Sequence, residues 1–251
     1  MLRQRVATGP TWRYPSHRQC LLLTAITTVS LAVPCVHFLP NQLLNTGYAH
    51  RFDASNDEAT GRIGGNEPDA PGLWRASIDI AKAWEGTLRE AKTPKTRKVA
   101  LRSAIVMSPD RGGAFDVLLG LTRRGLGGPI AGGHQFVSWI HDHDFVRAVR
   151  FLLERDDVEG PINLAAPCPL PQRDFMAALR VAWGAQIGLP ATRWMVEVGA
   201  LFLRTETELV LKSRRVVPGR LLDAGFSFDY REWPAAADDL VTRWKMEGRQ
   251  Q

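Results

Sequence analysis

The chain has 251 residues, of which 45% are hydrophobic and 23% charged, an ordinary composition for a globular protein able to bury a core. Cys20, Cys35 and Cys168 are too few for a disulfide framework and have no metal-binding spacing, so we expect a reducing, cytoplasmic location. The net charge is +6, and the first 52 residues supply most of it, with five arginines and no acid before Asp53; this distribution does not describe a nucleic-acid-binding face.

Residues 1–45 differ in composition from the rest of the chain. A basic stretch over 3–18 precedes a 17-residue uncharged run over 20–36. Four interpretations stay open: a signal peptide or membrane anchor, a span near the lower limit for crossing a membrane, a buried strand, or arbitrary sequence placed before a domain by a wrong start or a frameshift. We expect this segment to pack poorly and to carry no catalytic residue. Membrane association through 20–36 stays an alternative to the cytoplasm.

After residue 46 the hydrophobic pattern alternates between strands and helices. Polar residues over 53–72 predict a surface loop, and apolar residues at helical spacing predict a helix over 74–91. Apolar residues on both faces predict a central parallel strand over 98–107. The pattern then predicts helices over 112–124, 144–155 and 170–183, the second of them capped by Asp144, and strands over 136–140 and 161–166.

This alternation predicts an α/β fold, with a partial Rossmann-like parallel sheet over 46–185. The remaining residues, 186–251, are predicted to form a small, mainly helical C-terminal domain. Its expected helices cover 192–203, 206–215, 218–225 and 234–244.

Three blocks of sequence carry a resemblance to a known family. They read ALRSAIVMSPDRGG (100–113), GLGGPIAGGHQFVSWIH (125–141) and KSRRVVPGRLLDAGF (212–226). Together they resemble an atypical branch of the extended short-chain dehydrogenase/reductases, the sugar-nucleotide epimerase-like proteins with a C-terminal domain of unknown function, over about residues 46–244. The resemblance implies a nicotinamide cofactor, NAD(P), across a Rossmann sheet and a nucleotide-sugar-like small molecule as substrate.

Two signatures of that family do not occur in the printed sequence. Family members carry G-x-x-G-x-x-G after their first strand, so that backbone amides and a helix N-terminus meet the cofactor pyrophosphate. The glycine run over 125–130 has an apolar residue where a third glycine should fall. In the helix expected to carry Tyr-x-x-x-Lys, Ser77 takes the tyrosine place and Ala81 the lysine place, with Lys82 one residue off. We therefore expect a truncated or degenerate NAD(P)-dependent epimerase or oxidoreductase that does not bind NAD(P) tightly.

The resemblance also names candidate catalytic and cofactor-binding residues. Thr46 and Tyr48 end the strand that carries an S-x-x-x-Y pattern in the family, although Leu44 occupies the serine position. They are the candidate catalytic residues. Arg102 is a charge inside an apolar strand, which is costly unless paired. Two interpretations of Arg102 stay open: a contact to a cofactor phosphate or ribose, and an arginine that reaches solvent or an acid.

Gln135, Trp139 and His141 are the candidate residues of the substrate pocket. For Trp139 core packing is the alternative, and for His141 it is a structural role. The run 141–144 (HDHD) looks like a metal cluster, but alternate residues at a strand-to-helix junction point in opposite directions, so we expect no metal.

Two other classes of protein stay open as alternatives to an enzyme. The same fold can serve as a non-enzymatic interaction protein that offers an exposed sheet edge to a partner. The third class is a membrane-anchored domain that uses residues 20–36. We expect no nucleic-acid partner in any of these cases.

Overall fold

The computed structural model of the 251-residue chain describes residues 48–49, 52–64, 72–191, 212–213 and 215–247. The segment 1–45 and the helix predicted over 192–203 lie outside these ranges, as does most of the helix predicted over 206–215. Within them, no helix is long and apolar enough to cross a membrane.

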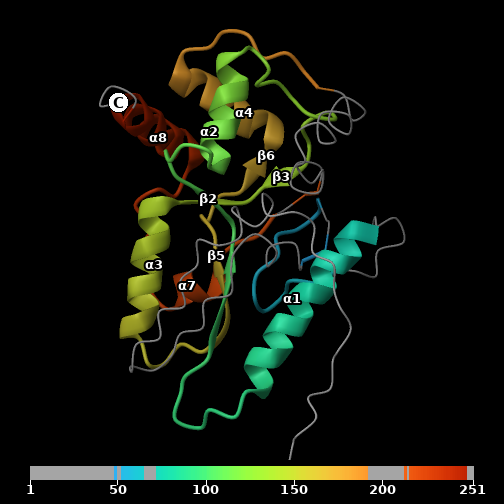
Figure 1. Cartoon of the computed structure of the whole chain (residues 1–251), viewed down its shortest axis with the longest axis vertical. Coiled ribbons are helices and arrows are strands. Elements are labelled where there is room, and N and C mark those ends of the chain that lie inside the picture. Colours follow the sequence, from blue (N-terminus) through green and yellow to red (C-terminus); the bar gives the residue numbers. More distant parts are fainter. Residues whose placement is uncertain (1–47, 50–51, 65–71, 192–211, 214, 248–251) are drawn as a thin grey trace, which may run out of the picture. The chain divides into compact units, whose positions relative to one another are not determined.

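The helices and strands alternate along the chain, as the hydrophobic pattern predicts. The helices are α1 (Gly72–Glu90), α2 (Ala114–Arg123), α3 (Asp142–Glu154), α4 (Gln172–Trp183), α7 (Gly219–Asp223) and α8 (Trp233–Glu247) (Figure 1). The strands are β1 (Val99–Ser103), β2 (Ile105–Met107), β3 (Phe136–Val137), β4 (Trp139–His141), β5 (Gly160–Leu164) and β6 (Leu170–Pro171).

The central apolar segment forms two consecutive strands with different neighbours. Strand β1 pairs in parallel with β5, and β2 pairs in parallel with β4. The change occurs at Ala104, whose amide donates to the Leu164 carbonyl at 2.8 Å, while the next amide, of Ile105, donates to the Ser138 carbonyl at 3.4 Å. The predicted parallel α/β architecture is therefore confirmed. Strands β3 and β6 add a short antiparallel pair.

Two hydrophobic clusters fill the interior. The first joins β1, β4, α3 and β5 to the segment around α7, and all five residues of β1 are buried in or beside it. The second joins β2, β4, α2, α4 and α8. Apolar residues on both faces of β1, with helices before and after the strand, are typical of a parallel sheet covered by helices.

Helix α8 contributes to the same core as α4. The Trp233 ring stacks on Phe175 with centroids 3.9 Å apart, and its indole nitrogen donates to the Phe175 carbonyl at 2.8 Å. Trp233 also meets Trp139 edge to face at 5.0 Å. The C-terminal helix thus shares its buried surface with residues before 185, while the boundary expected between 185 and 186 stays a prediction.

Helix α3 begins two residues earlier than predicted, and Asp144 is not its cap. The cap is His141, whose side chain accepts the backbone N–H of His143. Asp144 is fully buried, and its carboxylate accepts the amides of Asp229 at 3.0 Å and Tyr230 at 2.8 Å. Any of the four polar residues 141–144 could have capped the helix from the sequence alone. Asp144 is instead used by its hydrogen bonds to the amides of Asp229 and Tyr230.

Adjacent leucines of α3 provide a matched test of this packing. Leu152 is fully buried in the first cluster, whereas Leu153 is 47% exposed. We expect Leu152→Ala to lower the free energy of unfolding by about 2–5 kcal/mol, because it leaves a cavity among packed side chains. The control, Leu153→Ala, should cost less than about 1 kcal/mol. Urea denaturation followed by circular dichroism measures both; equal effects would show that the face of α3 is wrongly assigned.

Candidate functional site

Arg102 projects from the middle of β1 into a buried hydrogen-bond network. It is 8% exposed, and its Nε and Nη2 donate to the two carboxylate oxygens of Glu85 at 2.7 and 2.8 Å. Its Nη1 donates to the Tyr48 hydroxyl at 2.7 Å. Burial opposes the charge, but the hydrogen bonds to Glu85 raise the pKa of Arg102 above its ordinary value. Each of the three guanidinium nitrogens therefore has a partner inside the protein.

Tyr48 sits at the other end of this network. It is 2% exposed, and its hydroxyl donates to Asn163 Oδ1 at 3.0 Å. Burial raises the pKa of the Tyr48 phenol, although Arg102 acts in the opposite direction. The phenol is therefore held protonated, with both its donor and an acceptor position used. Thr46, the other candidate catalytic residue, lies outside the described residues.

Asn163 extends the network to the C-terminal part of the chain. Its side-chain nitrogen donates to the Val217 carbonyl at 3.0 Å, and its backbone amide donates to Glu58 at 2.7 Å. Lys82, the residue one place off the family's lysine position, is exposed and donates to the Gly64 carbonyl at 3.3 Å. The network thus ties α1, β1, β5 and two loops together.

The glycine-rich run packs against its own chain. A Cβ on Gly128 would lie 2.4 Å from the Leu189 carbonyl oxygen, and one on Gly133, whose φ is +68°, would lie 2.7 Å from Arg173. The amide of Ile130 donates to the Gln172 side chain at 3.0 Å. The amides of Ala131 and Gly133 likewise donate to the carbonyls of Ala191 and Ile130, so these three amides already bind protein atoms. These residues do not fit the phosphate groups of a dinucleotide.

Gln135 belongs to the same packed loop. It is 6% exposed, and its side-chain nitrogen donates to the Ile130 carbonyl at 3.1 Å. Trp139 is fully buried in the second cluster, and its indole nitrogen has no hydrogen-bond partner within the described ranges. Their expected roles in a substrate pocket stay predictions.

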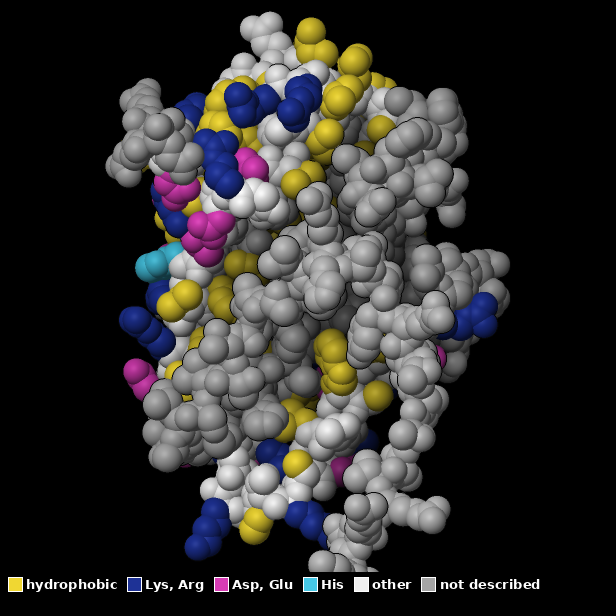
Figure 2. Space-filling view, in the orientation of Figure 1, with side chains coloured by type: hydrophobic (Ala, Val, Ile, Leu, Met, Phe, Trp, Pro, Cys, Tyr) yellow, Lys and Arg dark blue, Asp and Glu magenta, His cyan; other side chains and the backbone are white. Residues whose placement is uncertain are grey.

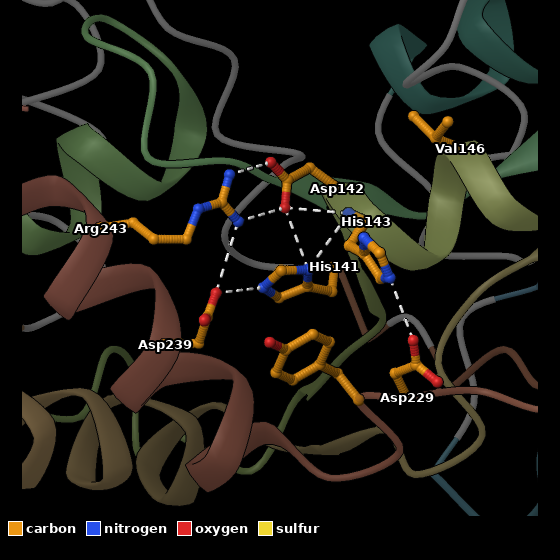
Figure 3. Close-up of a pocket in the computed structure, with 8 residues that line it drawn as sticks. His141, Asp142, His143, Val146, Asp229, Asp239 and Arg243 are labelled. Carbon is orange, nitrogen blue, oxygen red and sulfur yellow. Dashed lines mark hydrogen bonds and ion pairs between the residues drawn. The ribbon is translucent and has the colours of Figure 1, made fainter.

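His141 lies at the centre of a charged network between β4 and α8 (Figure 3). Its ring is 3.0 Å from Asp239 through Nε2 and 3.0 Å from Asp142 through Nδ1, and it stacks on Tyr230 with centroids 3.8 Å apart. Asp142 accepts two hydrogen bonds from the Arg243 guanidinium, at 2.8 and 2.6 Å. Arg243 also reaches Asp239 at 3.4 Å.

The surroundings of Asp142 and Tyr230 in this network shift the pKa of both groups. Burial alone would raise the pKa of Asp142, but the hydrogen bonds from Arg243 and the interaction with the nearby His141 ring hold it well below the ordinary value. Burial raises the pKa of the Tyr230 phenol, and Asp239 raises it further. At neutral pH, Asp142 is therefore a carboxylate and Tyr230 a neutral phenol.

An open cavity of about 470 Å³ borders this network. It is lined by His141, Asp142, His143, Val146, Asp229, Tyr230, Asp239 and Arg243. Basic, acidic and histidine side chains gather over α8 and the start of α3 in the space-filling view (Figure 2). Within the part of the chain that the structure describes, no three His, Cys, Asp or Glu side chains are grouped to hold a metal ion. The polar side chains that line the cavity bind one another, and these interactions connect β4 and α3 to α8.

Sequence reasoning found His141 and missed its partners. Asp239 and Arg243 lie about a hundred positions later in the chain, and their own pattern, an acid four residues before an arginine on a helix, is common on solvated surfaces. Of the candidate residues, the structure brings Tyr48 and Arg102 into direct contact. Gln135, Trp139 and His141 take part in other contacts.

Comparisons with known proteins agree with this fold. A family model described as a domain of unknown function, DUF1731, matches residues 191–240. The human epimerase family protein SDR39U1 is 33% identical over 163 residues, which are 65% of this chain and 54% of the human protein. The chain thus spans about half the length of the relatives it matches.

Two solved structures are similar to this chain in fold. Human SDR39U1 (isoform 2), crystallised with NADPH, matches with a TM-score of 0.66 and 28% identity, over 78% of this chain and 62% of the human chain. A nucleoside-diphosphate sugar epimerase from Corynebacterium glutamicum matches with a TM-score of 0.56 and 20% identity, over 82% of this chain and 44% of that one, which shows a shared fold.

The lowered pKa of Asp142 predicts how stability depends on pH. A carboxyl whose pKa is lower in the folded chain than its ordinary 3.8 stabilises the fold above that value and loses this contribution as the pH falls toward the folded pKa. We expect Asp142→Asn to destabilise the protein by about 1–3 kcal/mol at pH 7, because Arg243 loses a charged partner. The difference from the unmodified protein should shrink below about pH 4. Urea unfolding at pH 3–7 measures it; a difference independent of pH would contradict the ionic role.

Proposed function

We propose that the chain is an atypical epimerase-like short-chain dehydrogenase/reductase. We further propose that its residues form the substrate-side part of an NAD(P)-dependent epimerase or oxidoreductase. The support is the match to an NADPH-bound relative of the same fold. The substrate class we propose is nucleotide-sugar-like, because a nucleoside-diphosphate sugar epimerase shares this fold. The activity belongs to intact relatives; for this chain we propose a truncated or degenerate form.

The hydrogen-bond network around Arg102 is the observation that supports a degenerate form with weak cofactor binding. An arginine that contacts a cofactor phosphate or ribose must offer at least one free donor toward it. In this chain Nε, Nη1 and Nη2 of Arg102 each donate one N–H to Glu85 or Tyr48, and the residue is only 8% exposed, so little of the guanidinium is accessible to a cofactor. We infer that Arg102 stabilises the sheet and contributes little to holding NAD(P).

The acid–base chemistry of the family supports the same inference. A nicotinamide cofactor supplies the hydride acceptor, and the protein must supply a base that takes a proton as hydride leaves. Tyr48 supplies little phenolate, the form that could accept a proton, because burial raises its pKa and its hydroxyl proton is donated to Asn163. Tyr48 also has only 2% of its surface exposed. We therefore propose that Tyr48 acts by positioning β1 and β5.

A non-enzymatic interaction protein on the same fold is the second candidate. The hydrogen-bond network around Arg102 supports this candidate, because Arg102 and Tyr48 bind other residues of the protein and leave little surface for a substrate. Incubation of the purified chain with UDP-glucose and NAD(P), followed by chromatography of the nucleotide sugars, tests for enzyme activity. Conversion of UDP-glucose would contradict the interaction protein, whereas the degenerate form and the interaction protein both predict no conversion.

Cofactor binding gives the direct test of the proposal. We expect titration of the purified chain with NADPH, followed by nicotinamide fluorescence, to show no saturable binding at low micromolar concentration. The few contacts that remain for the cofactor do not offset the entropy lost when a flexible dinucleotide is ordered. Human SDR39U1, which crystallises with NADPH, is the positive control. Saturation of this chain in the range where the control saturates would show the proposal to be wrong.

A further inference from the structure

A second surface of the protein combines cations and indole rings. The Arg111 guanidinium lies 3.8 Å from the centroid of the Trp244 ring, and that of Arg123 lies 4.8 Å from the same ring. Arg123 is also 5.3 Å from the Trp183 ring, and the Lys245 ammonium is 4.6 Å from it. The two rings meet edge to face at 5.8 Å. We call these five residues the cation–indole cluster.

The fold assembles this cluster from segments far apart in the sequence. Arg111 precedes α2, Arg123 ends α2, Trp183 ends α4, and the remaining two residues lie on α8. A shared buried surface, the second hydrophobic cluster, holds these three helices together. The printed sequence therefore shows no stripe of aromatic and basic residues, although the folded chain has one.

A hydrogen bond to Asp116 fixes the Trp244 ring of the cluster. The Trp244 indole nitrogen donates to Asp116 at 2.7 Å, and Asp116 also accepts the Gly112 amide at 2.9 Å. Burial alone would raise the pKa of Asp116, but these hydrogen bonds and the nearby arginines bring it below the ordinary value. Asp116 therefore stays charged, and Trp244 presents a fixed ring to the cations above it.

The cations of the cluster are exposed and incompletely neutralised. Arg111 has Asp116 at 3.6 Å, but Arg123 and Lys245 make no ion pair or hydrogen bond with any residue that the structure describes. Arg124, next to Arg123, is also exposed. Lys and Arg side chains gather over α2, α4 and α8 in the space-filling view (Figure 2). Three positive charges fixed over aromatic rings, with Asp116 as their counter-ion among the described residues, leave a net positive surface complementary to an anion.

We propose that the cation–indole cluster docks an acidic segment of a partner protein, through its aspartate and glutamate carboxylates. Arginine matches a carboxylate with two parallel hydrogen bonds, and cations already ordered over rings lose little side-chain entropy on binding. Single-stranded nucleic acid fits less well, because its bases need a free aromatic face for stacking and cations lie over both rings. This proposal is independent of cofactor binding.

The probe for this proposal is a fluorescein-labelled peptide of ten glutamates. Binding to the full chain is followed by fluorescence anisotropy at about 50 mM salt, where exposed charges are weakly screened. We expect Arg123→Glu together with Lys245→Glu to weaken binding at least about ten-fold, since two attractions become repulsions. The matched control is Lys92→Glu with Lys95→Glu, two exposed lysines that follow α1. It carries the same charge change and should alter binding by less than about two-fold.

Milder variants and a second probe complete the design. Arg123→Gln with Lys245→Gln removes the charges without reversing them, and thermal unfolding by circular dichroism shows that each variant is folded. This pair should weaken peptide binding as well. Equal weakening by the cluster and control variants would overturn the proposal. Tighter binding of a ten-nucleotide oligo(dT), with the same dependence on Arg123 and Lys245, would also overturn it and would assign the surface to nucleic acid.

Discussion

The two-fold hydrogen-bonded ion pair between Arg102 and Glu85 is the interaction on which the described sheet depends. A guanidinium in the middle of a buried strand is costly unless its charge and donors find partners. Glu85 supplies both from α1, and so fixes that helix against β1. The third guanidinium nitrogen, Nη1, continues the chain of hydrogen bonds through Tyr48 and Asn163 to β5 and the segment before α7. Loss of any member would leave a buried polar group without a partner.

A second network of paired charges fixes the C-terminal helix α8. His141, Asp142, Asp239 and Arg243 bind one another across β4, α3 and α8, with Tyr230 stacked on the imidazole. Such a network has a definite geometry only when all its members are present, which makes it specific as well as stabilising. A tyrosine, an arginine, a histidine and several aspartates, which are residue types typical of active sites, contact one another here across secondary-structure elements.

Much of the fold could be predicted from the sequence, because it depends on local periodicity. The apolar residues over 98–107 predicted a central parallel strand, and the helices that follow were found to within a few residues. The change of neighbour at Ala104 could not be predicted, since it depends on Ser138 and Leu164. Asp144 was taken for a helix cap because no local signal reveals its bonds to the amides of Asp229 and Tyr230.

The candidate site was less accessible to sequence reasoning. The sequence showed Arg102 as a charge that needs a partner, and a position facing an acid was one of two interpretations, but the pairing with Glu85 depends on how α1 crosses the sheet. The sequence distinguished the glycine run from a phosphate loop because the run lacks a third glycine, and this distinction stays a prediction. The cation–indole cluster left no trace in the sequence, since its rings come from α4 and α8 and its arginines from α2 and the loop before it.

The central claim is that Arg102 holds Glu85 and Tyr48 inside the protein and does not bind the cofactor. Its Nε–H signal in a ¹H–¹⁵N spectrum of the labelled chain, assigned by its disappearance in Arg102→Lys, reports on this directly. The claim predicts a slowly exchanging signal that does not move when NADPH is added to millimolar concentration, because the donor remains on Glu85. A signal that exchanges rapidly with water, or that shifts in a saturable way with NADPH, would contradict it.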